Sequence, residues 1–403
     1  MQKTLYKILG LTLSLSMFGS VAAVAASAAE AETMHYQNYT VMGDSIAAGY
    51  GTDNYFGGET EKIEDERIVE GTYADLVAQG VGAKNAISVA HSGWRTTEIL
   101  RVLKDDYTLE DDTRILQDMS DFYLRALTML PKEQFYYRDE NGEWAQDENH
   151  MYLIQPSIKK HIKDSVRSAD LITVQFGSND IYSTALSTTY NKYEQILEKT
   201  GLFDINLNIQ SQEDLENAFA VLLEVAKVAG QFKNLLADYF IELENGFATY
   251  KKNMPMVLEE IRKLNPDAKI LIVGVANPTS ITGDLPLKIW DYSELYAARI
   301  NGWTSSFCKS NDCLFAKCDT IDYYGIASLD TDKLFPFDED IKYSAVKMMH
   351  PTETGHQQMA EEILTALEED WDATIAYTVA ALEKSSDDAT QTQILASLAR
   401  LIG

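Results

Sequence analysis

The sequence predicts an α/β fold of three layers, with helices on both faces of a parallel sheet. Two observations lead to this prediction. Short runs rich in β-forming residues alternate with helical patterns along the chain, which is typical of α/β domains. Several of these runs are almost continuously apolar, as strands are when helices bury both faces of their sheet.

The predicted elements follow one another in regular order. Strands are expected at residues 39–42, 86–90, 171–176 and 269–275, with a weaker fifth candidate at 320–324. Helices are expected near residues 72–79, 96–103, 158–168, 247–264 and 289–307. A last helix is expected to start after Pro351 and to run to about Glu369.

Two stretches, 104–157 and 184–245, are too long to be plain connections. The first holds charged and aromatic residues without a strong period, and the second contains an amphipathic helix at 213–239. We expect both to be helical insertions above the sheet, which form either a lid over a site or additional packing. Residues 376–403 are expected to form a separate C-terminal helical extension, with its best helix at 391–402.

The N-terminus has the three-part layout of a secretory signal peptide. Lys3 and Lys7 give a positive start, residues 8–24 are apolar and uncharged, and Ala26-Ser27-Ala28 is a small-x-small cleavage site. We therefore expect residues 1–28 to be removed and the chain to be secreted, with an uncleaved N-terminal anchor as the alternative. No later stretch is long and apolar enough to span a bilayer, so no stable membrane insertion is expected after cleavage.

The charge of the chain limits its partners. The chain carries 34 basic and 62 acidic residues, and loss of Lys3 and Lys7 with the signal peptide changes the formal charge from −28 to −30. A surface this acidic repels phosphate backbones and disfavours docking on anionic lipid. Nucleic acid is therefore not an expected partner.

Three cysteines, Cys308, Cys313 and Cys318, lie within one short segment. In an oxidising compartment two of them can close a small loop and leave the third free. Three cysteines at this spacing without a nearby histidine match zinc patterns poorly, so neither a metal site nor a cysteine nucleophile is expected.

The first motif with chemical content is Gly43-Asp44-Ser45, directly after the first predicted strand. A serine at the carboxyl end of a parallel strand lies where α/β folds bind their ligands. Its hydroxyl can project into a crevice, toward which the following helix directs backbone N–H groups. Alone the motif is weak, because Gly-Asp-Ser is a common turn.

Two further turns follow the second and third predicted strands. The second strand leads into Ser92-Gly93-Trp94-Arg95-Thr96, where a glycine permits close approach of the backbone and can direct its N–H at an oxyanion. Arg95 in this turn either binds a carboxylate or sugar hydroxyl or forms a surface ion pair. The third strand leads into Gly177-Ser178-Asn179-Asp180, which places an amide at the same sheet edge. Fixed donors of this kind stabilise the charge that builds on a carbonyl oxygen in a tetrahedral intermediate.

The fourth motif is His350-Pro351 near the C-terminus. Proline suits the first turn of a helix, which leaves His350 in the preceding loop. A serine hydroxyl becomes a good nucleophile when a neighbouring base accepts its proton, and histidine is the obvious base. His356 and Glu353 also suggest a metal site, but Gly355 interrupts the segment, and we expect His356 to be structural.

In their order along the chain, the four turns resemble the motifs of the SGNH hydrolase family, also called GDSL esterases and lipases, across roughly residues 36–370. The resemblance rests on Ser45, Gly93, Asn179 and His350. It implies a flavodoxin-like α/β/α sandwich with a five-stranded parallel sheet, formed by residues 29–375. It also implies that Ser45 attacks an ester carbonyl with His350 as general base. The N–H groups of Ser45 and Gly93 and the side chain of Asn179 would form the oxyanion hole.

One position departs from the family pattern. The family usually has an aspartate three residues before the histidine to orient the imidazole, and here that position is Lys347. A lysine cannot accept the imidazole N–H. Either a backbone carbonyl accepts it, which makes a Ser–His dyad, or an acid from residues 338–340 or from the insertions does. A weak or inactive enzyme is a further alternative, because loss of an orienting carboxylate can cost several orders of magnitude in rate.

The resemblance therefore predicts a secreted carboxylic ester hydrolase that works through a Ser45 acyl-enzyme without cofactor or metal. Its substrate would be a small-molecule, lipid or glycan ester, with acyl lipids and acetylated polysaccharides as the two leading classes. Acyl transfer to a glycan and a binding module without catalysis are the alternatives. Oligomeric state and natural substrate stay open.

Overall fold

The computed structural model describes residues 36–52, 68–107, 139–143, 145, 153–183, 185, 231–276, 289–324 and 350–384. Within these ranges the chain forms one sheet from five strands: β1 (Asn38–Gly43), β2 (Asn85–Ser88), β3 (Leu171–Gln175), β4 (Lys269–Val273) and β5 (Leu314–Ala316). All neighbouring strands are parallel, in the order β2-β1-β3-β4-β5. This is the flavodoxin-like order, so the predicted α/β/α sandwich with five parallel strands is confirmed.

The register brings the carboxyl ends of the strands to one edge. Tyr39 of β1 lies beside Ala86 of β2 and Leu171 of β3, and Gly43 at the end of β1 lies beside Gln175 at the end of β3. The turns that follow β1, β2 and β3 therefore start side by side.

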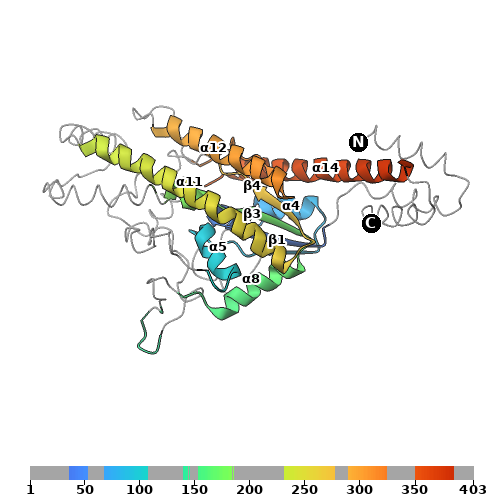
Figure 1. The fold of residues 1–403 in the computed structure, drawn as a ribbon, viewed down its shortest axis with the longest axis horizontal. Helices are drawn as coiled ribbons and strands as arrows, with labels where there is room; N and C mark the ends of the chain where they lie inside the picture. The colour runs from blue at the N-terminus through green and yellow to red at the C-terminus, as the bar shows by residue number, and fades with distance from the viewer. Residues whose placement is uncertain are drawn as a thin grey trace, which may run out of the picture.

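Helices cover both faces of the sheet (Figure 1). One face packs against α5 (Thr96–Leu103), α8 (Pro156–Ser168), α11 (Gln231–Leu264) and α12 (Ile289–Ser310). The other face packs against α4 (Tyr73–Gly80) and α14 (Glu353–Lys384). Burial of a large aliphatic side chain stabilises the fold by about 1.5–3 kcal/mol, and each face has its own core of such residues.

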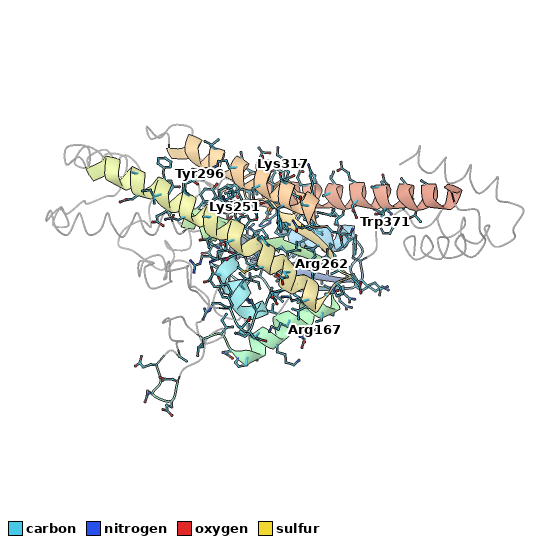
Figure 2. All side chains as sticks on the ribbon, viewed as in Figure 1. Arg167, Lys251, Arg262, Tyr296, Lys317 and Trp371 are labelled. Atoms are coloured by element: carbon cyan, nitrogen blue, oxygen red, sulfur yellow. The ribbon has the colours of Figure 1, made fainter. Side chains whose placement is uncertain are left out.

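β3 shows how the sequence fills both cores. Ile172 and Val174 belong to the first core, while Leu171 belongs to the second, and all three are buried. A continuously apolar strand is what two covered faces require. Side chains fill the space between helices and sheet, and Trp371 lies near the point where α14 leaves the body of the molecule (Figure 2).

The prediction of a fifth strand at 320–324 is wrong. β5 is the short run Leu314–Ala316, next to β4. Ile321 and Tyr323 are buried and the residue between them is exposed, which gives the segment the alternating pattern of a strand. Tyr323 instead forms an isolated antiparallel bridge with Pro351.

Helix α11 begins at Gln231 and not near residue 247 as predicted. Glycine ends many helices, but Gly246 lies within this one. A Cβ at Gly246 would stand 2.4 Å from the carbonyl oxygen of Asp180, so the glycine permits close packing instead. The rest of the predicted insertion at 184–245, and most of that at 104–157, lies outside the described residues.

Helix α14 starts at Glu353 and runs to Lys384, past the predicted end near Glu369. No glycine or proline follows Gly355 in this helix, so nothing in its sequence stops it. It therefore crosses residue 375, where we expect the C-terminal extension to begin. The best predicted helix of that extension, 391–402, lies outside the described residues.

Pro351 precedes α14, so the helix starts after this proline as predicted, although the proline lies before its first turn and not in it. The N-terminus is held by Thr352, whose Oγ1 accepts a hydrogen bond from Gly355 N at 3.0 Å. In the part of the chain that the structure describes, no helix has both the length and the apolar character to cross a membrane.

Candidate active site

Ser45 and His350 meet at the carboxyl edge of the sheet. Ser45 directly follows the β1 turn as the first residue of α3 (Ser45–Ala48), and its Oγ lies 2.7 Å from Nε2 of His350. The two residues are 305 positions apart in sequence, and both are buried. The distance is short enough for the imidazole to accept the hydroxyl proton.

The turn before Ser45 is fixed by Asp44. Its Oδ1 accepts from Ile46 N at 2.9 Å and caps α3, and its Oδ2 accepts from the side-chain amide of Gln175 at 3.4 Å. The carboxyl group is fully buried, and this burial raises its pKa to about 7. A Cβ at Gly43 would stand 2.6 Å from the carbonyl oxygen of Gln175, so the turn requires glycine here.

The turns that contain Gly93 and Asn179 are joined to this edge and to each other. His91 N donates to Gly43 O at 3.0 Å, which ties the β2 turn to the end of β1. Gly93 has φ 79°, a conformation that favours glycine. The side-chain amide of Asn179 donates to Trp94 O at 3.1 Å. The structure therefore brings Gly93 and Asn179 onto adjoining turns at the edge that holds Ser45.

A buried polar network lies behind these two turns. The carboxylate of Asp180 accepts from Thr96 N at 3.1 Å and from the Thr96 hydroxyl. Asn253 of α11 donates from Nδ2 to Thr96 Oγ1 at 3.0 Å and to Thr97 Oγ1 at 3.3 Å. Burial raises the pKa of Asp180 to about 6, although the hydrogen bonds from Thr96 oppose this shift.

Tyr50, a tyrosine that closely follows the first motif in the sequence, also lies at the site. Its ring centroid lies 4.6 Å from that of His350, and the ring is almost completely buried. Tyr50 N donates to Ser45 O at 2.9 Å, so the turn that follows α3 brings the tyrosine back over the site. Asn253, by contrast, gives no local signal in the sequence, because it lies on helix α11 outside all four motifs.

His356 and Arg95 hold structural positions. His356 is buried, its Nδ1 accepts from Tyr73 N at 3.3 Å, and burial lowers its pKa to about 3. It is thus a neutral residue within the core, as predicted. Arg95 forms an ion pair with Glu98 at 2.9 Å, but both side chains are buried, so the expected surface position is wrong.

Lys347 and the candidate acids at 338–340 lie outside the described residues. Among the residues that the structure does describe, no three His, Cys, Asp or Glu side chains gather in a way that would hold a metal ion.

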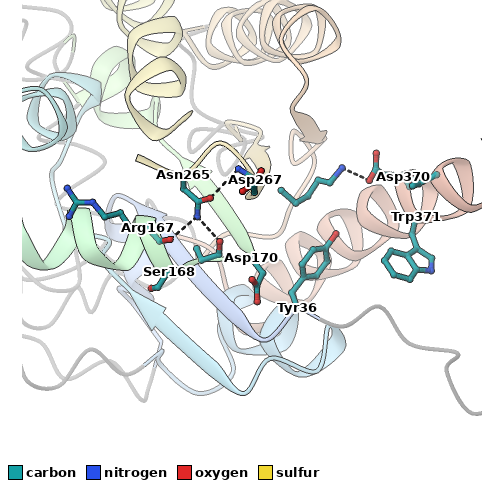
Figure 3. A pocket seen from close by; sticks show the side chains of 11 residues that line it. Tyr36, Arg167, Ser168, Asp170, Asn265, Asp267, Asp370 and Trp371 are labelled. Carbon is teal, nitrogen blue, oxygen red and sulfur yellow. Dashed lines mark hydrogen bonds and ion pairs between the residues drawn. The ribbon is translucent and has the colours of Figure 1, made fainter. Parts of the chain in front are cut away.

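A pocket of about 480 Å³ lies at the opposite edge of the sheet (Figure 3). Asp170 and Lys269, where β3 and β4 begin, line it together with Tyr36 and Trp371. Lys269 forms an ion pair with Asp370 at 2.8 Å across this region. Because Ser45 and His350 lie at the other ends of the strands, the pocket is separate from them.

Several solved structures are similar to this chain. Phospholipase A1 from Streptomyces albidoflavus NA297 has 13% sequence identity and a TM-score of 0.41, with 83% of this chain and 99% of that chain covered. An extracellular lipase from Streptomyces rimosus has 14% identity and a TM-score of 0.39, with 83% and 99% covered. The acetylxylan esterase Axe2 from Geobacillus stearothermophilus has 11% identity and a TM-score of 0.33, with 83% and 96% covered. Likenesses this distant say nothing about the substrate of this chain, and no curated protein matches it.

The sequence profile of one family matches the part of the chain that contains Ser45, Gly93 and Asn179. This family is described as GDSL-like Lipase/Acylhydrolase, and the match covers residues 39–203. Residues 39–203 therefore match the GDSL-like lipase/acylhydrolase family, which confirms the resemblance drawn from the motifs.

Proposed function

We propose that this protein is a secreted serine carboxylic ester hydrolase, with Ser45 as nucleophile and His350 as general base. The observation that carries the proposal is the 2.7 Å contact between Ser45 Oγ and His350 Nε2 at the carboxyl edge of the sheet. In this geometry Oγ attacks the ester carbonyl carbon while Nε2 accepts the hydroxyl proton. The tetrahedral intermediate then expels the alcohol, which takes that proton and leaves an acyl group on Ser45. Water attacks the acyl-enzyme by the same route and releases the acid.

Three donors are proposed to stabilise the negative oxygen of the intermediate: the N–H groups of Ser45 and Gly93 and the side-chain amide of Asn179. An amide nitrogen carries two hydrogens, and the bond to Trp94 O uses one of them and orients the group. Loss of one such donor costs about 10²–10³ in kcat in comparable sites.

The imidazole of His350 needs support, because Lys347 stands where the family usually has an aspartate. We propose a Ser–His pair in which Tyr50, 4.6 Å away between ring centroids, helps to hold the ring in place. The backbone carbonyl of His350 is held as well, since Tyr324 N donates to His350 O at 3.2 Å.

The proposed export depends on residues 1–28. If they are a cleaved signal peptide, the secreted protein begins at Ala29. Intact-mass measurement of protein recovered from the medium tests this directly, and a mass that includes residues 1–28 would contradict it.

The decisive experiment is reaction of the purified protein with a fluorophosphonate, which labels activated serines, followed by mapping of the adduct. We expect labelling at Ser45 in the wild type and none in Ser45→Ala, which should also lose turnover of nitrophenyl esters. Ser165→Ala is the matched control, because Ser165 is a buried serine of α8 away from the site. Folded wild-type protein that is not labelled would refute the proposal. The relative rates on acetyl and long-chain esters would indicate a deacetylase or a lipase.

A further inference from the structure

Two of the three proposed oxyanion donors, Gly93 and Asn179, lie on separate turns, and their relative position has to be fixed. Gly93 follows β2 and Asn179 follows β3, with β1 between these strands in the sheet. An error of about 1 Å in such a site can lower the rate about 100-fold. The residues that hold the two turns together therefore bear on catalysis even though they do not touch the substrate.

Two bridges join the turns directly. The amide of Asn179 donates to Trp94 O at 3.1 Å, next to Gly93. The following residue, Asp180, accepts from Thr96 N at 3.1 Å and from the Thr96 hydroxyl. Asn179 and Asp180, which are adjacent in the β3 turn, thus bind to Trp94 and Thr96 in the β2 turn.

Asn253 completes the arrangement from a third element, α11. Its Nδ2 lies 3.0 Å from Thr96 Oγ1 and 3.3 Å from Thr97 Oγ1, and the side chain is buried. A threonine hydroxyl has one hydrogen and two lone pairs. If the Thr96 hydrogen goes to Asp180, the oxygen accepts from Asn253, and the bonds run in one direction from Asn253 through Thr96 to Asp180.

The same helix also presses against the Asn179 turn. Asn179 begins a short π-helical turn, η2 (Asn179–Ser183), and Gly246 of α11 lies so close that a Cβ there would stand 2.4 Å from Asp180 O. Gly246 and Asn253 are two turns of helix apart, so one rigid helix contacts both donor-bearing segments.

We propose, on the basis of the esterase function above, that Asn253 is a positioning residue which acts through Thr96 and Asp180 to hold Gly93 and Asn179 at the separation that oxyanion binding requires.

The first test compares Asn253→Ala with Asn265→Ala. Asn265 is also buried, and it donates to Val166 O and Ala169 O at the opposite edge of the sheet, so its loss removes comparable hydrogen bonds away from the site. We expect Asn253→Ala to lower kcat about 10- to 100-fold with KM changed less than about threefold, since positioning of donors affects the transition state. Affinity for a boronic acid, which forms a tetrahedral adduct on Ser45, should fall with kcat. Asn265→Ala should lower stability and leave kcat unchanged.

A second pair of variants decides the matter if Asn253→Ala does not fold. Thr96→Ser keeps the hydroxyl and should retain kcat within about threefold, whereas Thr96→Val removes it and should match the loss expected for Asn253→Ala. The double variant should be little worse than either single one, because both break the same chain of bonds.

Unchanged kcat in Asn253→Ala and Thr96→Val, with stability lowered as in Asn265→Ala, would overturn the positioning role while the esterase function stands. A wild-type protein that neither reacts with the fluorophosphonate nor hydrolyses esters would instead overturn both proposals.

Discussion

At the scale of single residues, two histidines near the start of α14 differ in what surrounds them. His350 contacts the Ser45 hydroxyl, whereas His356 is enclosed in the core against Tyr73. They lie six positions apart in the sequence, and only the position of His350 at the sheet edge gives it access to a nucleophile.

Substitution of these two histidines should separate activity from stability. We expect His350→Ala to lower the kcat of the folded protein by about 10⁴-fold or more, because the proposed base is lost. His356→Ala should cost about 2–4 kcal/mol of stability, since it opens a cavity and leaves Tyr73 N without its acceptor, while the folded fraction keeps its kcat. Steady-state kinetics and urea unfolding of both variants check this, and loss of kcat in folded His356→Ala would contradict it.

Ionisation of the buried Asp44 carboxyl group lowers the stability of the folded protein. Its pKa is raised from 3.8 to about 7 by burial, so the unfolded chain ionises at lower pH than the native state does. The native state is therefore stabilised by this group below about pH 4 and loses that stabilisation as the pH rises through about 7. The full effect is on the order of 4 kcal/mol, at about 1.4 kcal/mol per pKa unit.

Asp44→Asn should therefore raise stability at pH 8 and leave it nearly unchanged at pH 4. An amide at this position can still accept from Ile46 N. Rotation of the Gln175 amide, whose nitrogen now faces Asp44, would let the side-chain oxygen of Gln175, which is buried without a hydrogen bond, accept from the new N–H. Urea unfolding at the two pH values, with Asp267→Asn as an exposed control, measures the difference. Equal stability of wild type and Asp44→Asn at pH 8 would show that the buried carboxylate is not costly.

The sequence predicts the residues of the site that belong to local patterns and misses those that do not. Ser45, Gly93 and Asn179 each follow a strand in a recognisable turn, and His350 precedes a proline. Asn253 has no such signal, because its importance comes from the packing of α11 against a turn far away in the sequence.

At the scale of the elements, strands and helices with a strong local sequence pattern are predicted, and those that depend on contacts with distant elements are not. The first four strands have four to six residues, and each was expected within about two residues of its place. β5 has three residues, of which two are only half-buried, so its sequence pattern is weaker than that of 320–324. The helix predicted near residues 247–264 starts too late, because α11 begins at Gln231. The packing of Gly246 against Asp180 O depends on a neighbouring element and has no local signal in the sequence.

Two glycines in helices should respond in opposite ways to alanine. Gly246→Ala would place a Cβ 2.4 Å from Asp180 O and 2.8 Å from Ile181 Cα, both backbone atoms, so α11 or η2 has to move. We expect a loss of about 1–3 kcal/mol. Gly302 of α12 has no atom within 4 Å of such a Cβ, so Gly302→Ala should gain about 0.5–1 kcal/mol from helix propensity. Urea unfolding of the pair checks both signs, and equal effects would show that α11 does not press on η2.

At the scale of the whole molecule, the sheet divides the three cysteines between its two faces. Cys308 and Cys313 belong to the core under α11 and α12, and Cys318 belongs to the core under α4 and α14. Cys308, near the end of α12, and Cys313, just before β5, share a hydrogen bond that lowers the pKa of Cys313. A backbone bond of 3.3 Å from Cys313 N to Cys308 O also closes this loop.

Export should therefore change the thiol content of the protein in a defined way. In an oxidising compartment we expect Cys308 and Cys313 to pair, because they are adjacent and Cys313 forms a thiolate more readily, whereas Cys318 is sealed on the other face. Alkylation of the unfolded protein should then find one thiol in secreted material and three in protein made in a reducing cytosol. Cys318→Ser should remove the single remaining thiol. Three thiols on the secreted protein would show that Cys308 and Cys313 stay reduced. Labelling of Cys308 alone would show that Cys313 pairs with Cys318 instead, so that the sheet does not keep these two cysteines apart.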